Sequence, residues 1–144
     1  MKNIHLILLL SFIFIGCNNQ AQSQDPIPVH DTFTIDSNLL NEKRTINVWK
    51  PENYSKTYDS LPVMYMPDGG TAEDFPHIAN TMSELIKTNK IPPFILVGIE
   101  NTVRRRALSG TTEVEKDKEV APVIGGASKF RAFIKDELFA EINK

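Results

Sequence analysis

A short apolar run that ends in a tight turn constrains the fold of this chain more than any other feature. Residues 61–66 read LPVMYM, and Pro67-Asp68-Gly69-Gly70 follows at once. An uninterrupted apolar stretch of this length, bounded by turn residues, is typical of a β-strand that is buried on both faces. Glycines directly after a strand allow a tight turn, or the close approach of another group to the backbone. The pattern therefore predicts a buried strand whose carboxyl end faces a ligand site.

Two alternating patterns upstream of this run predict an antiparallel pair of strands. Polar and apolar residues alternate over 32–36 and again over 44–49, as they do in strands that have one exposed face. The residues between them, 38–42, would form the connection. Pro51 ends the second pattern, and a polar loop leads from it to the apolar run.

Helical patterns follow the apolar run and alternate with a second strand. Residues 78–87 have their apolar side chains on one helical face, and 94–99 is another continuous apolar run. Residues 101–122 are charged and irregular, which predicts a long loop. An amphipathic helix then begins at Ala127 or Ser128. Its apolar stripe consists of Phe130, Phe133, Ile134, Leu138 and Ile142. This order of elements predicts an α/β sheet with crossover helices.

The first residues predict an export signal. Residues 4–15 are almost wholly apolar after a weakly positive start, and this stretch is too short for a comfortable membrane span. The single cysteine follows in Phe14-Ile15-Gly16-Cys17, which resembles the lipobox of bacterial lipoproteins. That resemblance implies cleavage before Cys17 and a lipid on its thiol. An ordinary signal peptide that is cut near residues 21–23, or a buried cysteine, is the alternative.

Three segments are expected on this basis. Residues 1–16 would be a lipoprotein signal peptide, 17–28 a polar tether, and 29–144 the folded domain. A lipid on Cys17 would hold an exported protein on the bacterial cell envelope without a membrane-spanning helix. The expected partners are accordingly a lipid membrane and a small molecule.

Charge and residue spacing exclude several classes of function. The chain of 144 residues carries 16 basic and 18 acidic residues, so its charge balance gives no reason to expect nucleic-acid binding. No group of histidines and cysteines has metal-ligand spacing, and no cofactor is expected. The one basic run, Arg104-Arg105-Arg106, is predicted to be a solvated loop face rather than a phosphate site. Trp49 would pack on the sheet edge or line a pocket.

Four segments, in this order along the chain, resemble the putative-esterase branch of the α/β-hydrolase superfamily, which includes enterochelin-esterase-like and esterase-D-like proteins. The four are 41–51, 65–70, 97–102 and 125–138. The resemblance implies the amino-terminal half of an α/β-hydrolase sheet. No serine of the chain lies in the Gly-x-Ser-x-Gly elbow that carries the nucleophile of this superfamily. The catalytic serine, acid and histidine are therefore expected beyond Lys144, and none of them in this chain.

The resemblance also implies a site after the apolar run. One oxyanion donor of α/β-hydrolases is a backbone N–H group after the third strand, and Gly69 and Gly70 match that position. A turn that only reverses the chain is the alternative. Asp68, His77 and Asn101 would line the pocket. His77 is not expected to be the catalytic base, because the base follows the nucleophile in the chain order of this superfamily.

The resulting hypothesis is an exported, membrane-tethered serine esterase that acts on carboxylic esters, of the siderophore-ester or carbohydrate-acyl-ester class. The chain alone would be inactive, since it lacks the nucleophile. Two alternatives stay open: a non-catalytic lipoprotein with a binding or structural role, and an acyltransferase of the same fold. The non-catalytic alternative is disfavoured because the strand at 61–66 would expose an apolar edge without a further strand beside it.

Overall fold

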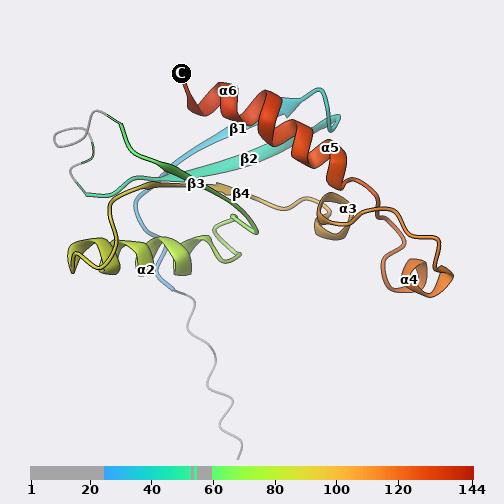
Figure 1. Cartoon of the computed structure of the whole chain (residues 1–144), viewed down its shortest axis with the longest axis horizontal. Helices are drawn as coiled ribbons and strands as arrows, with labels where there is room; N and C mark the ends of the chain where they lie inside the picture. Colours follow the sequence, from blue (N-terminus) through green and yellow to red (C-terminus); the bar gives the residue numbers. More distant parts are fainter. Residues whose placement is uncertain (1–24, 53, 55–59) are drawn as a thin grey trace, which may run out of the picture.

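The computed structural model describes residues 25–52, 54 and 60–144, and Figure 1 shows their arrangement. The signal peptide predicted over 1–16, Cys17 and most of the tether lie outside these residues. Within them, one four-stranded sheet has the order β1-β2-β4-β3. Its strands are β1 (Asp31–Ser37), β2 (Glu42–Trp49), β3 (Val63–Pro67) and β4 (Ile95–Ile99). This mixed sheet with its helices confirms the predicted α/β fold.

The strand pairing follows the sequence patterns. β1 and β2 are antiparallel, with Ser37 opposite Glu42, so the predicted hairpin is confirmed. Its turn contains Asn41 at φ 54°, a left-handed conformation that asparagine tolerates well. β2 is also antiparallel to β4, whereas β3 and β4 are parallel, with Pro67 beside Ile99. The parallel pair is joined by α2 (Phe75–Lys87), which is the crossover helix.

Helices cover both faces of the sheet and create two cores. α2 lies on one face, and the carboxyl-terminal helical segment lies on the other (Figure 1). That segment consists of α5 (Ala127–Ala132), η1 (Phe133–Leu138) and α6 (Phe139–Ile142). Side chains of β4 alternate between the two cores. Val97 packs on the side of Phe133 and Leu138, and Leu96 packs on the side of α2 with Phe75.

The two apolar runs differ in their burial. All five residues of β4 are buried, as a doubly covered strand requires. β3 was expected to be buried on both faces, but it is an edge strand of the described sheet, and only Met66 is buried in it. Met64 is 42% exposed. The prediction was wrong for β3 in this sheet because β4 is its one described neighbour.

The region after β4 contains more structure than the predicted loop. α3 (Arg104–Leu108) and α4 (Glu115–Val120) interrupt residues 101–122. Both helices are so short that apolar periodicity gives no signal for them. The three arginines predicted to form a solvated loop face begin α3; Arg104 and Arg105 are exposed as predicted, but they are helical. Each of the three donates a hydrogen bond to another part of the chain.

The last helical segment is continuous but widens in the middle. Its central turn, η1, is π-helical, whereas the flanking turns are α-helical. The wider turn has about one residue more than an α-helical turn, which lets residues five apart share a face. Phe133 and Leu138 have that spacing, and both are fully buried. The apolar stripe predicted from the sequence therefore faces the core through this change of pitch.

Candidate functional site

Four of the predicted site residues gather at the carboxyl ends of β3 and β4. Asp68, Gly69 and Gly70 follow β3, and Asn101 follows β4. Because the two strands are parallel and in register at their last residues, both connections leave the sheet at the same edge. The side chains of Asp68 and Asn101 meet there, with 2.5 Å between Asn101 Nδ2 and Asp68 Oδ1.

The turn after β3 owes its shape to a left-handed aspartate and to a close contact between two glycines. Asp68 has φ 57°, and neither Gly69 nor Gly70 has a positive φ. Gly69 instead lies so close to β4 that a Cβ on it would be 2.3 Å from Gly98 Cα. Its N–H donates to Ile99 O (3.0 Å), and its carbonyl accepts from Asn47 Nδ2 (2.9 Å). Gly69 thus extends the parallel pairing of β3 with β4, and its N–H already donates a hydrogen bond within that pairing.

The Gly70 N–H has an acidic partner. It donates to Glu73 Oε2 at 2.7 Å, and the N–H of Asn101 donates to the same oxygen at 3.3 Å. Asn101 Nδ2 donates to the other carboxylate oxygen, Oε1, at 2.6 Å. The Glu73 carboxylate therefore bridges the two connections. Two backbone N–H groups, one from each connection, converge on one of its oxygens.

Arg104 also binds Asp68. Its Nε donates to Oδ1 (2.6 Å) and its Nη2 to Oδ2 (2.8 Å), which is the two-point geometry that guanidinium and carboxylate favour. These bonds hold the pKa of Asp68 below its usual value, although burial raises it, and the bond from Asn101 acts in the same direction as those from Arg104. Asp68 is therefore an ionised anchor, and its charge is already matched.

A buried arginine of β2 holds the connection that follows β4. The side chain of Arg44 is fully buried on β2, and its Nη1 donates to the carbonyl of Glu100 (3.1 Å), the residue before Asn101. Its Nη2 lies 2.8 Å from Glu42 Oε1, in a geometry that forms an ion pair but not a hydrogen bond. The guanidinium lies over the ring of Phe130, with 5.1 Å between Arg44 Cζ and the ring centroid.

Glu42 joins this arginine to α3. Burial raises the pKa of Glu42, but the hydrogen bond from Arg106 and the charges of Arg44 and Arg106 outweigh that effect and lower it. The Arg106 Nη2 atom lies 2.5 Å from Glu42 Oε2. The connection after β4 is thus fixed at its start by Arg44 and further along by α3.

His77 lies apart from this group. It stands in the first turn of α2, its side chain is 68% exposed, and its Nδ1 lies 2.6 Å from Asp25 Oδ2. The structure therefore brings Asp68, Gly69, Gly70 and Asn101 together and leaves His77 outside the group. Its predicted role in lining a pocket stays a prediction.

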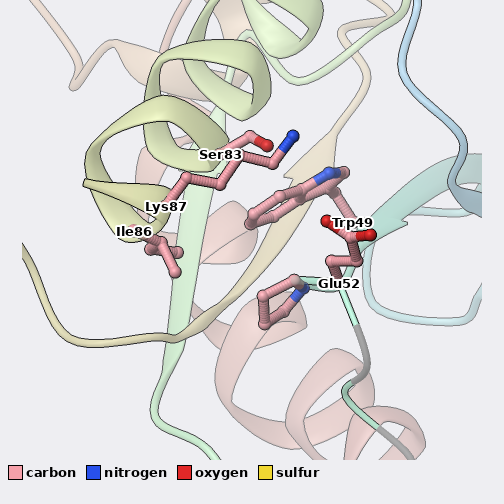
Figure 2. A pocket seen from close by; sticks show the side chains of 6 residues that line it. Trp49, Glu52, Ser83, Ile86 and Lys87 are labelled. Atoms are coloured by element: carbon pink, nitrogen blue, oxygen red, sulfur yellow. The ribbon is translucent and has the colours of Figure 1, made fainter. Parts of the chain in front are cut away.

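A separate pocket lies at the other end of the sheet. It has a volume of about 190 Å³ and is lined by Trp49, Pro51, Glu52, Ser83, Ile86 and Lys87. Figure 2 shows side chains of α2, among them Ser83 and Lys87, on one side of the Trp49 indole, with Glu52 on the other. Trp49 pairs with Leu96 near the start of β4, so this pocket is far along the strand from Asn101. Trp49 both packs on the core and lines a pocket.

Sequence reasoning missed three residues of the site: Glu73, Arg104 and Arg44. A glutamate three residues after Gly70 and an arginine three residues after Asn101 are visible in the sequence, but nothing local predicts that they meet. Arg44 is part of an alternating strand pattern, in which a polar residue is expected to face solvent, so the pattern gave no sign of its role. In the described part of the chain, no group of three histidine, cysteine or acidic side chains could hold a metal ion. None of its helices is long and apolar enough to cross a membrane.

The model of the family described as putative esterase matches residues 37–144, which include every residue of this site. The chain belongs to this esterase family. The match begins at the end of β1 and covers both connections, α2 and the carboxyl-terminal helices. A comparison with curated proteins gives no match.

Solved structures agree with this assignment. The chain is 31% identical to an IroE-like serine hydrolase from Shewanella oneidensis, with a TM-score of 0.71, over 80% of this chain and 38% of that one. The BES protein from Bacillus cereus shares the fold at 22% identity and a TM-score of 0.64, over 85% and 51% of the two chains. The enterobactin esterase FES from Shigella flexneri does so at 15% and 0.55, over 86% and 28%. The chain thus spans about 28% to 51% of the length of these relatives.

Proposed function

We propose that this chain supplies the amino-terminal half of the catalytic domain of a serine esterase that hydrolyses carboxylic esters. The observation that carries the proposal is the esterase-family match over 37–144, combined with a donor-lined edge at the carboxyl ends of β3 and β4. Acyl transfer from an ester requires an activated nucleophile and donors for the developing oxyanion. The described residues provide backbone N–H groups that could serve as these donors. The nucleophile is proposed to lie outside these residues, in the part of the related serine hydrolase that this chain does not cover.

The backbone N–H of Gly70 is the proposed oxyanion donor of this half. It lies at the chain position where α/β-hydrolases place a donor after the third strand. Gly69 was the other candidate, but its N–H is buried in the pairing with Ile99. The Gly70 N–H already accommodates an anionic oxygen at 2.7 Å, a distance suited to an oxyanion.

The substrate class and location are part of the same proposal. An ester of a siderophore or of an acylated carbohydrate is the proposed substrate. The FES structure, that of an enterobactin esterase, was solved in the presence of enterobactin, which supports the first of these. The protein is proposed to be exported and anchored to the cell envelope through a lipid on Cys17.

Expression of the full reading frame with short-chain p-nitrophenyl esters tests the esterase assignment. We expect hydrolysis that a serine-directed phosphonate abolishes, and we expect none from residues 1–144 alone. A full-length protein that hydrolyses no ester would refute the function. For the anchor, a Cys17→Ser variant should lose labelling by a fatty-acid probe and leave the membrane fraction; labelling that persists would refute lipidation at Cys17.

A further inference from the structure

The Glu73 carboxylate occupies the donors that an ester oxygen needs. Its Oε2 accepts from the N–H groups of Gly70 and Asn101, and its Oε1 accepts from the Asn101 side chain. A Cβ on Gly70 would lie 2.8 Å from Oε2, so the carboxylate is packed directly on the backbone of the turn. A backbone N–H makes one strong hydrogen bond at a time. Glu73 and a substrate oxygen are therefore alternative acceptors.

We propose that Glu73 is an internal competitor that keeps free carboxylates out of the oxyanion site. This inference rests on the proposed function, because it assigns the same Gly70 N–H group to the ester oxygen. In the resting protein the Glu73 carboxylate fills a small anion site formed by Gly70 and Asn101. During turnover the carbonyl oxygen of the ester, bound through the rest of the substrate, takes the place of Oε2.

Ester hydrolysis makes such a competitor useful. Its acid product is a carboxylate, which has the same charge and oxygen geometry as the Glu73 side chain. A site with two converging N–H groups and an amide donor would retain that product if it stood empty. Glu73 lies three residues from Gly70, so its effective concentration at the site far exceeds that of a free acid. The tethered carboxylate thereby favours release of the product.

The surroundings allow Glu73 to leave without stranding a buried charge. The side chain is partly exposed, so its carboxylate can turn to solvent. Asn101 then keeps Asp68 Oδ1 as an acceptor, and Arg104 keeps the charge of Asp68 paired. Both connections also stay held by contacts that do not involve Glu73, from Gly69 to β4 and from Arg44 to Glu100. Exchange of the acceptor therefore does not require the site to unfold.

Acetate titration of the full-length protein tests the proposal. Selective ¹⁵N labelling of glycine and asparagine reports the amide signals of Gly70 and Asn101 in wild type and in Glu73→Ala. We expect acetate to shift both signals in the variant, with half-saturation at about 1–10 mM, in the weak range for a single small anion. Wild type should need at least about 10-fold more acetate, because Glu73 competes.

Controls separate this role from a structural one and from the proposed function. Glu84→Ala removes an exposed glutamate of α2 and should titrate like wild type. Glu73→Gln, which keeps an acceptor but loses the charge, should respond between wild type and the alanine variant, and it serves in place of that variant should Glu73→Ala not fold.

The same acetate series is run with an ester substrate. Acetate should inhibit the Glu73→Ala enzyme at least about 10-fold more strongly than wild type. Equal acetate shifts in wild type and variant, or shifts in neither, would overturn the inference even if the enzyme is an esterase. Absence of ester hydrolysis with the expected acetate response would overturn the proposed function alone.

Discussion

Replacing Gly69 with alanine tests whether the contact between the two strand ends shapes the site. The added Cβ would lie 2.3 Å from Gly98 Cα and from Ile99 N, both backbone atoms that cannot turn aside. Relief requires β3 and β4 to separate at this end, which weakens the hydrogen bond from Gly69 N–H to Ile99 O. Overpacking of this kind costs about 1–3 kcal/mol, and the lost bond about 1 kcal/mol more. We expect the free energy of unfolding to fall by about 2–4 kcal/mol.

Urea unfolding, followed by circular dichroism, measures that free energy. Gly110→Ala is the matched control, because a Cβ there meets nothing within 4 Å. The control should change stability by less than about 1 kcal/mol, in the stabilising direction, since alanine restricts the unfolded chain. A Gly69→Ala protein as stable as the Gly110→Ala protein would refute the claim that backbone contact fixes this turn.

Three further perturbations address the charged contacts. The pKa of Asp68 is lowered from 3.8, so its stabilising effect is complete well above that value and is lost as the pH falls through the lower folded pKa. The stability advantage of wild type over Asp68→Asn should thus be constant above about pH 5 and shrink below pH 4; an advantage that grows on acidification would contradict this. Arg44→Met should cost about 3 kcal/mol, against less than about 1 kcal/mol for the exposed Lys43→Met, when both are measured by urea unfolding. Glu137→Ala, which removes the acceptor of two backbone N–H groups, should lower the thermal midpoint, and an unchanged midpoint would show that those bonds contribute nothing.

Much of the architecture follows from local patterns, and the exceptions have physical causes. The alternation over 32–36 and 44–49 predicted the hairpin correctly, because one face of that pair packs on the carboxyl-terminal helices. The apolar run at 61–66 predicted the secondary structure correctly, as a strand, but its predicted burial on both faces was wrong. The apolar side chains indicate the burial that this strand needs in the complete fold. In the described sheet, β3 has β4 as its one neighbour, so most of its residues stay partly exposed. α3 and α4 were missed because five or six residues are too few for a periodic signal.

The site shows the same division between local and distant information. Gly69 and Gly70 were identified from the turn that follows an apolar run, and the register of β3 with β4 brings them close to Asn101. The partner of Gly70 was not foreseeable, because it depends on the side chain of Glu73 turning back onto its own turn. The role of Gly69 was foreseen only in part. The close approach to β4 requires glycine at position 69, whereas the residue with a positive φ is Asp68.

The contact between Glu137 and the hairpin turn has a consequence for synthesis on the ribosome. Glu137 Oε1 accepts the N–H groups of Asn38 and Leu39, which lie 99 and 98 residues earlier in the chain. At translation rates of about 5–20 residues per second, the turn is synthesised about 5–20 s before its acceptor. During that interval the first hairpin lacks both this acceptor and the helix that covers it. Synonymous codons between positions 40 and 137 would therefore set how long the nascent hairpin waits for its cover.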